Sequence, residues 1–339
     1  MSNPAFRPVF RFLATRIARL AAVLLLVAVV AFTLAKVSPV DPVNAYLGID
    51  IARVGPEQRN LIAARWGLDQ PPLAQFVLWA GNLLHGDLGF SMIYNAPVAE
   101  VIAARFWTSL PLVGLAWLFS GIFGFVLGVV AGANAGSWLD RVIRLYAYFL
   151  SAAPTFWIAI LLLIVFAVAL GWSPVCCAGP LGVVPADVTF AERLQHLALP
   201  LAALTLLGVA QVALHTRAKI AEILQLDAAL YARAQGAGKW DVVLRHGVRN
   251  AALPAITILF ASLGELFGGS ILAEQVFAYP GLGQAAVAAG VRGDVPLLLA
   301  ITLFLTLFVS VGNMIADMLY HLVDPRIREA EFAAGGVHG

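Results

Sequence analysis

Six long apolar stretches, separated by segments that carry the charged residues, dominate the pattern of this chain. Each is about as long as the roughly 20 residues that an α-helix needs to cross the hydrocarbon core of a bilayer. Prolines such as Pro154 and Pro200 are tolerated there because neighbouring helices satisfy the freed carbonyls. The pattern predicts an all-α membrane protein with six transmembrane helices, at 17–37, 109–133, 145–172, 196–216, 254–274 and 295–319.

Composition supports this class. Of 339 residues, 61% are hydrophobic and 12% are charged, and the charged share is about half that of a soluble domain. The first apolar stretch follows several arginines and resembles a signal peptide. Because "FTLAK" (32–36) is a poor cleavage site and five more stretches follow, we interpret it as an uncleaved anchor.

The basic residues predict the orientation. If the N-terminus is cytoplasmic, fourteen of the 21 basic residues fall on the cytoplasmic side. Cytoplasmic loops carry such an excess of Lys and Arg, whereas long external segments cross largely regardless of charge. We therefore expect both termini to be cytoplasmic. The fourteen are Arg7, Arg11, Arg16, Arg19, Arg141, Arg144, Arg217, Lys219, Arg233, Lys239, Arg245, Arg249, Arg326 and Arg328.

The same pattern predicts the domain organisation. Residues 1–37 form the cytoplasmic N-terminus and first helix, and 109–323 form a five-helix core that includes a cytoplasmic loop, 217–253. Residues 324–339 are a cytoplasmic tail. The external segment 38–108 contains "GPEQRNLIAARWGLDQP", whose apolar spacing predicts a short surface helix, and "LLHGDLGFS" (83–91), which predicts a turn. An ordered segment of this length is either a docking surface or a lid over a pore.

The loop 217–253 is the most informative segment. Asp227 is a candidate N-cap for a helix with the body "AALYARAQ", and Gly236 and Gly238 end it. A helix of about two turns is unstable alone in water, so it must pack against something. Small residues recur about every four positions and predict a smooth strip that another protein approaches closely; they are Ala228, Ala229, Ala232 and Gly236.

A second amphipathic run follows this helix. The run places the apolar residues Val242, Leu244 and Val248 opposite a polar face of Arg245, His246, Arg249 and Asn250. The sequence "AALP" then returns the chain to the bilayer at Pro254. A basic loop alone satisfies the positive-inside rule, but the small-residue strip, the glycine break and this return together favour a coupling element. The "GAGK" at 236–239 is no phosphate-binding loop, because Arg233 and Trp240 occupy positions that need glycine and a hydroxyl.

Several ordered motifs resemble the membrane permeases of ATP-driven dipeptide, oligopeptide and nickel importers. "YARAQG" (231–236) and "VVLRHGVRNAALP" (242–254) are similar to that family's EAA loop, although Leu230 replaces the acidic residue of the general pattern. Further motifs stand in the family's order along most of the chain. They are "RWGLDQPPLAQF" (65–76), "HGDLGFS" (85–91), "APTFWIAILL" (153–162), "LGWSPV" (170–175), "EQVFAYPGLG" (274–283) and "MLYHLVDPRIR" (318–328).

This resemblance implies a type I ABC importer permease fold in a bacterial or archaeal inner membrane. It implies partners: a second homologous permease in a heterodimer, two ATPase subunits and an external substrate-binding protein. ATP and Mg would be bound by the ATPases, and this chain would bind no cofactor and hydrolyse nothing. The short helix would sit in a groove of an ATPase. The resemblance places the coupling loop on Tyr231, Ala232, Ala234, Gly236, Gly238, Arg245, His246, Arg249, Asn250 and Pro254.

One charge lies deep within an apolar stretch. Glu265 is near the middle of 254–274, where insertion of a charge costs at least about 2.5 kcal/mol, so it must face water or a partner. It either lines the translocation path and meets a cationic group of the substrate, or forms an interhelical hydrogen bond with Gln211 or Asn313. The glycines at 264, 268 and 269 predict close helix packing along this stretch.

No further chemistry is evident. Cys176 and Cys177 are adjacent in a predicted external loop, and they form a vicinal disulfide, bind a soft metal or are incidental. The histidines and methionines form no metal-binding pattern, and no nucleophile has a spaced base. A self-sufficient secondary transporter or channel is the alternative function, but it predicts inverted repeats, which the sequence does not show. The sequence does not distinguish dipeptides, oligopeptides and metal chelates as substrates.

Overall fold

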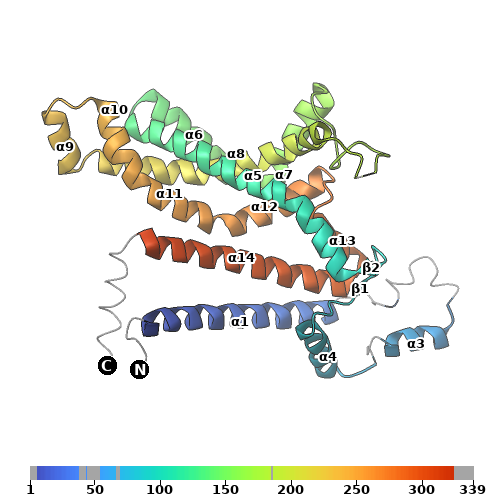
Figure 1. Cartoon of the computed structure of the whole chain (residues 1–339). Helices are drawn as coiled ribbons and strands as arrows, with labels where there is room; N and C mark the ends of the chain where they lie inside the picture. Colours follow the sequence, from blue (N-terminus) through green and yellow to red (C-terminus); the bar gives the residue numbers. More distant parts are fainter. Residues whose placement is uncertain (1–5, 38–42, 44–53, 66–68, 185, 324–339) are drawn as a thin grey trace. The chain divides into compact units, whose positions relative to one another are not determined.

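The computed structural model describes residues 6–37, 43, 54–65, 69–184 and 186–323 (Figure 1). The predicted cytoplasmic tail and most of the chain between 38 and 53 therefore lie outside the described residues. The chain divides into two compact units, one of Met1–Thr108 with Gly281–Ser310 and one of Ser109–Pro280 with Val311–Gly339. Each unit thus combines segments that are distant in the sequence.

The first unit contains two helices of the external segment, the first apolar helix and a short hairpin. The predicted surface helix and turn are confirmed as α3 and as the turn at Gly86 and Gly89, whose φ angles are +83° and +84°. In order, the elements are α1 (Phe6–Val37), α3 (Pro56–Arg65), α4 (Pro72–Leu84), β1 (Phe90–Ser91), β2 (Ala96–Pro97), the start of α5 (Val98–Ala133), α13 (Leu282–Arg292) and the start of α14 (Val295–Val323). The two strands pair antiparallel, with Phe90 opposite Pro97.

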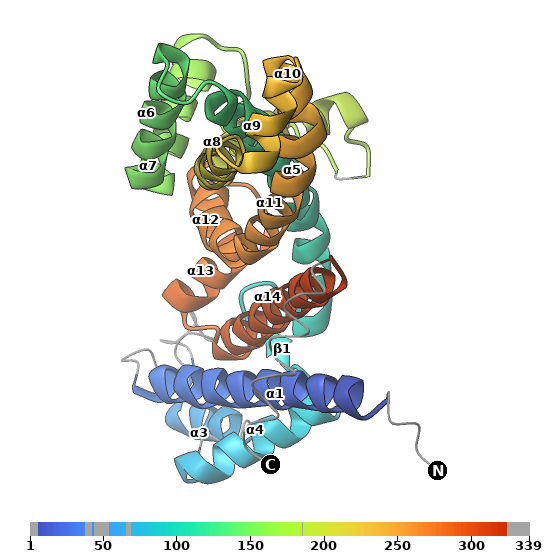
Figure 2. The ribbon, with the colours of Figure 1, turned by 90° about the vertical axis from the view of Figure 1, so that its left-hand side faces the viewer.

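The second unit is built around one long helix, α8 (Phe190–Ile223), which α6, α7, α11 and α12 contact (Figure 2). A capping box of Thr189 and Glu192 begins this helix. The unit also contains the rest of α5 and of α14. Its other elements are α6 (Trp138–Ala152), α7 (Thr155–Leu162), the π-helix η2 (Leu163–Ala169), α9 (Asp227–Ala234), α10 (Lys239–Val242), the π-helix η3 (Val243–Val248), α11 (Arg249–Ala261) and α12 (Leu263–Val276).

Four of the six predicted spans are continuous apolar helices in the described part of the chain: Ala14–Leu34, Val98–Ala133, Phe190–Ile223 and Val295–Ile315. The third and fifth are helix pairs, bent by 108° between α6 and α7 and by 48° between α11 and α12. Pro154 precedes α7 and has no N–H, and Ala153 before it is extended with ψ of 132°, so the third span cannot be one straight helix. If each pair is counted as one span, the described residues contain six helices or helix pairs long and apolar enough to cross a membrane.

Glycines on α5 allow it to pack closely along α8. A Cβ on Gly124, Gly128 or Gly132 would lie 2.5–2.6 Å from the Cβ of Val212, Thr216 or Ile220 respectively. Each would also lie 2.8–2.9 Å from a backbone oxygen of α8. Both helices advance by four residues from one contact to the next in the same direction, so they run parallel. Of the glycines predicted to pack closely along 254–274, Gly268 would place a Cβ with nothing within 4 Å, whereas a Cβ on Gly269 would lie 3.5 Å from Leu204 and 3.6 Å from Thr155.

In the first unit, one buried carboxylate joins the hairpin turn to the start of α14. Asp294 is 1% exposed. Its Oδ2 accepts hydrogen bonds from Ser91 Oγ at 2.7 Å, Met92 N at 2.8 Å and Ile93 N at 3.1 Å, and its Oδ1 accepts from Leu297 N at 3.2 Å. The carboxylate thus satisfies two amides of the turn and one amide at the N-terminus of a helix, where a negative charge is favourable.

Asp294→Ala is expected to lower the free energy of unfolding by at least about 2 kcal/mol, because it leaves buried donors without an acceptor. Thermal unfolding of the purified protein in detergent measures this loss. Asp87→Ala is the control, since Asp87 is exposed and accepts a hydrogen bond from Gly89 N at 2.8 Å. Equal losses in the two variants would contradict the role assigned to Asp294.

Candidate functional site: the loop between α8 and α11

The short helix predicted in the loop is α9, Asp227–Ala234. The predicted N-cap is wrong, because Leu226 occupies that position and provides no side-chain cap. Asp227 is instead the first helical residue, where its negative charge stabilises the helix by interacting with the positive end of the helix dipole. Gly236 ends the helix with φ of +91°. The amides of Gly236 and Ala237 donate to the carbonyls of Arg233 and Ala232 at 2.9 and 3.1 Å, which closes the turn as glycine commonly does after a helix.

The small-residue strip of α9 does not lie on one free surface. Ala229 is 1% exposed and Ala232 packs against the same core cluster, so these two face the chain's own helices. The outward surface instead carries Leu230 and Tyr231, which are 50% and 67% exposed. Ala234 and Gly236 are also exposed. The prediction that Ala229 faces a partner is therefore wrong, because the chain itself supplies the packing that a two-turn helix needs.

The second amphipathic run has a different register from the predicted one. After α10, residues Val243–Val248 form a π-helix, whose wider turns shift the positions that face inward. Val242 and Val243 are buried, whereas Leu244 is 60% exposed, which contradicts its predicted apolar role. The predicted polar face is confirmed as exposed, and it comprises Arg245, His246, Arg249 and Asn250. Gly238 precedes α10 as its N-cap, and Pro254 lies inside α11.

The loop is fixed to the ends of α5 and α8. One apolar cluster joins Val129 of α5, Ile220 of α8, Ala229 of α9 and Val243 of η3. Lys239 Nζ donates to Asn134 Oδ1, in the turn after α5, at 2.7 Å. The loop therefore moves only if the ends of these helices move with it or its packing is lost.

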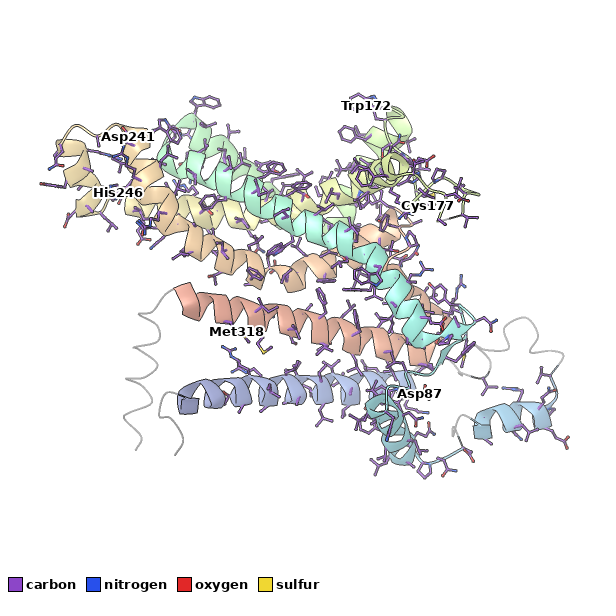
Figure 3. All side chains as sticks on the ribbon, viewed as in Figure 1. Asp87, Trp172, Cys177, Asp241, His246 and Met318 are labelled. Atoms are coloured by element: carbon purple, nitrogen blue, oxygen red, sulfur yellow. A yellow bond between two sulfur atoms is a disulfide. The ribbon has the colours of Figure 1, made fainter. Side chains whose placement is uncertain are left out.

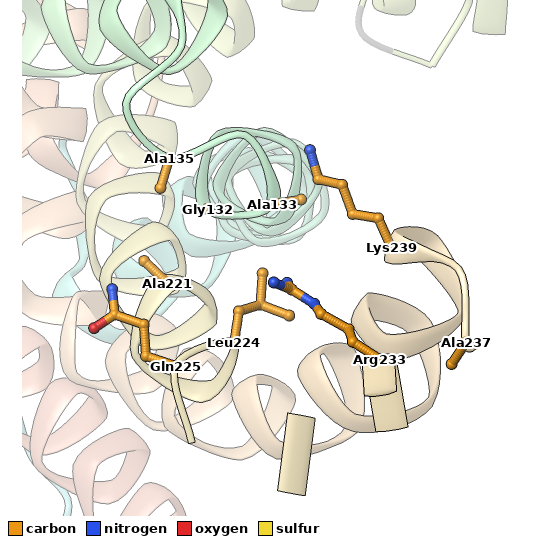
Figure 4. Close-up of a pocket in the computed structure, with 9 residues that line it drawn as sticks. All are labelled: Gly132, Ala133, Ala135, Ala221, Leu224, Gln225, Arg233, Ala237 and Lys239. Atoms are coloured by element: carbon orange, nitrogen blue, oxygen red, sulfur yellow. The ribbon is translucent and has the colours of Figure 1, made fainter. Parts of the chain in front are cut away.

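A cavity of about 550 Å³ lies beneath α9, between the ends of α5 and α8 (Figure 4). The side chains of Arg233 and Lys239 reach toward the end of α5 from the loop side. Cations there are favourable, because the last carbonyls of a helix carry a partial negative charge. The cavity is lined by Gly132, Ala133, Ala135, Ala221, Leu224, Gln225, Arg233, Ala237 and Lys239.

A buried ion pair lies close to this end of the second unit. Asp140, in the first turn of α6, is 0% exposed. Its two oxygens accept from Arg217 Nε at 2.9 Å and Nη2 at 2.7 Å, and Oδ2 also accepts from Gly136 N at 2.9 Å. Arg144 Nε lies 3.4 Å from Oδ1. Arg217 belongs to α8, which continues to Ile223 rather than ending at the predicted start of the loop.

Glu265 makes the interhelical hydrogen bond that was one of its two predicted roles. Gln211 Nε2 of α8 donates to Glu265 Oε2 of α12 at 2.6 Å. The Glu265 side chain is nevertheless exposed, as is that of Asn313 in α14, and Gln211 is half-buried. Exposed polar groups within membrane-spanning helices commonly face water or another protein.

The segment between η2 and α8 lies at the opposite end of the second unit. Figure 3 shows Asp241 and His246 at one end of the unit and Trp172 and Cys177 at the other. Cys176 and Cys177 form a disulfide, and the amide of Cys177 donates to the carbonyl of Phe277 at 2.9 Å. Burial, followed by the nearby Glu274 carboxylate, raises the pKa of Tyr279 to about 12. This phenol is thus neutral at physiological pH.

Sequence reasoning missed the Asp140–Arg217 pair, Asp294 and the α5 glycines. Only the glycines had a local signal, since small residues at four-residue spacing mark helix contacts in membranes. The two aspartates bind groups that are distant along the chain. Among the described residues, no group of three or more His, Cys, Asp or Glu side chains is placed to hold a metal.

These features define a polytopic helical membrane protein with a short helix presented at one end on a rigid support. The chain belongs to the family of binding-protein-dependent transport system inner membrane components, whose model matches residues 124–329, and the N-terminal model of the same family matches 9–113. It is therefore a permease component of an ABC importer with the type I fold.

Named relatives cover nearly the whole chain. The oligopeptide transport system permease protein AppB of Bacillus subtilis is 33% identical over 90% of this chain and 95% of its own length. A putative peptide transport system permease of Brucella abortus is 36% identical over 92% and 97%. The glutathione transport system permease protein GsiC of Escherichia coli is 34% identical over 90% and 94%.

Proposed function

We propose that this chain forms half of the translocation pathway for peptides or related small solutes, and that α9 docks into a separate ATPase subunit. The observation that carries the docking is the geometry of α9. Its inner side is held by Ala229 on the chain's own core, while Leu230 and Tyr231 project outward with more than a third of their surface free. An exposed apolar pair on a fixed helix is suited to insertion into a groove of another protein.

The proposed partners are a second homologous permease, two ATPases that bind ATP and Mg, and an external substrate-binding protein. ATP-driven closure of the ATPases would move α9, and its packing against α5 and α8 would convert that motion into a rigid-body change between inward-open and outward-open states. The names of the relatives support peptides or glutathione-like molecules as substrates. Nickel or another metal chelate is a family-level alternative.

We further propose that both termini and the loop between α8 and α11 are cytoplasmic in a bacterial or archaeal inner membrane. The support is the excess of Lys and Arg on that side. Under this orientation, Glu265, Gln211 and Asn313 lie within the membrane on the side that faces the pathway, where their exposed polar groups meet water and substrate. The residues of the loop that face the ATPase in this arrangement are Tyr231, Ala234, Arg245, His246, Arg249 and Asn250.

Gly236→Glu is expected to leave the protein inserted while reducing ATPase binding and substrate uptake at least about tenfold, which equals a loss of about 1.4 kcal/mol. A Cβ at Gly236 meets nothing within 4 Å in this chain. The new side chain therefore projects into the space that the ATPase would occupy. Co-purification of the ATPase and uptake into vesicles that contain the complete transporter measure the two effects.

Gly86→Glu is the matched control, since Gly86 has φ of +83° and equally open surroundings. It imposes a similar backbone strain, of about 1–2 kcal/mol, in the unit of the chain that does not contain the loop. It should leave the amount of ATPase that co-purifies unchanged. Normal uptake by Gly236→Glu, or substrate accumulation by vesicles that hold this chain without any ATPase, would refute the proposal and favour a secondary transporter or channel.

A further inference from the structure

α4 is a short helix of the first unit whose sequence, PLAQFVLWAGNLL, contains no charged residue. Its 13 residues extend about 20 Å at 1.5 Å per residue. This length is too short to cross the roughly 30 Å of hydrocarbon in a bilayer. An uncharged helix of this kind either lies at the membrane surface or is covered by protein.

Contacts with α1 place α4 at the end of the first apolar span. Phe32 of α1 packs against Phe76 and Trp79 of α4, with ring centroids 5.3 and 5.9 Å apart. Lys36 Nζ also donates to Gln75 Oε1. The apolar run of α1 ends at Leu34, so Phe32 lies about 3 Å from that end along the helix axis. α4 is therefore attached at the level where hydrocarbon gives way to headgroups.

The side of α4 that faces away from α1 is aliphatic and exposed. Leu73, Val77, Leu78 and Leu84 are 75%, 61%, 56% and 87% exposed, respectively. The apolar run of α1 beside it is also almost entirely uncovered, with 6% of its positions buried. The aromatic residues Phe76 and Trp79, which protein interfaces favour, are the ones turned toward α1. The side chains of α4 that face outward are therefore aliphatic, like the lipid-facing side chains of a membrane helix.

We propose that α4 lies in the lipid bilayer interface, with Leu73, Val77, Leu78 and Leu84 inserted among the acyl chains of the leaflet where α1 ends. Trp79 and Lys36 then sit at the headgroup level, as interfacial tryptophans and lysines do. Amphipathic helices bind membranes in this way through the apolar area that they bury. α3 differs, because Glu57, Arg59 and Arg65 make it hydrophilic. Within the external segment, α4 is thus a lipid anchor, whereas α3 contacts water or a protein partner.

Spin labelling tests the proposal independently of the substrate and of the ATPase. A nitroxide is attached to Val77→Cys in the complete transporter in lipid nanodiscs, with Cys176 and Cys177 replaced by serine. Collision with O2, which concentrates in hydrocarbon, is compared with collision with a water-soluble nickel chelate. The ratio of the O2 rate to the chelate rate at residue 77 is expected to exceed several-fold the ratio at Leu61→Cys, a 70% exposed position on α3.

Two results would overturn the proposal. A ratio at residue 77 equal to that at residue 61 would place α4 in water. Low collision rates with both reagents would show that a protein covers it, either the second permease or the binding protein. Leu78→Cys, on the same exposed face, provides a second reading if the label at 77 prevents assembly.

Discussion

Gly128→Ala is expected to destabilise the protein by about 2 kcal/mol, the typical cost of adding atoms to a close-packed site. The new Cβ would lie 2.5 Å from Thr216 Cβ and 2.8 Å from the carbonyl oxygen of Ala213. A backbone oxygen cannot rotate away, so α5 must move from α8. Because Gly124 and Gly132 make the same contact, the shift also strains neighbouring contacts, and the end of α5 that supports the loop moves with it.

Thermal unfolding in detergent and uptake by the complete transporter measure this effect. Gly114→Ala is the control on the same helix, since a Cβ at Gly114 meets nothing within 4 Å. Alanine is the better helix former by up to about 1 kcal/mol, so this variant should be unchanged or slightly more stable. A loss of stability of the same size in both variants would show that the parallel α5–α8 contact is not close-packed.

Asp140→Ala is expected to cost about 3 kcal/mol, because removal of one partner leaves the other charge of a buried pair uncompensated. The Arg217 side chain is 24% exposed and that of Asp140 is 0% exposed, so water compensates the guanidinium only in part. The variant also removes the acceptor for the amide of Gly136, in the turn that holds Asn134 near Lys239. We expect transport to fall further than stability alone explains, because the loop loses part of its support.

Lys219→Ala is the control for this prediction. Lys219 lies on α8 near Arg217 and pairs with Glu222 at 2.9 Å, but both side chains are exposed, at 37% and 58%. Exposed pairs contribute less than about 1 kcal/mol. The double variant Asp140→Ala, Arg217→Ala completes a mutant cycle, in which the summed losses of the single variants should exceed that of the double. Additive losses would contradict a direct pairing.

The apolar stretches predicted the number of crossings but not their shape. Pro154 was recognised as a residue that a membrane helix tolerates, yet the chain bends by 108° there. A proline in a span permits either a slight kink or a sharp turn, and the packing of α6 and α7 on α8 selects between them. The fifth span bends at Ser262, eight residues after its proline, Pro254, so the position of the proline did not mark this bend.

In the loop between α8 and α11, too, the sequence predicted some features and the tertiary packing decided others. Its place in the chain, its two-turn length and its terminating glycine all follow from local propensity and backbone conformation, which neighbouring residues determine. The π-helix after α10 does not follow from them, and it exposes Leu244 while burying Val243. For this reason the predicted face of the second run was only partly right.

The sequence by itself determined that this protein is a six-span helical membrane protein of the permease family, and it located the loop that we propose for coupling. These properties depend on hydropathy, short motifs and the signs of charges, all of which are readable along the chain. Only the tertiary structure decided which side of α9 is free, which glycines admit close packing and which arginine neutralises Asp140. These depend on contacts between residues far apart in sequence, and helical periodicity shows that a face is apolar without showing what covers it.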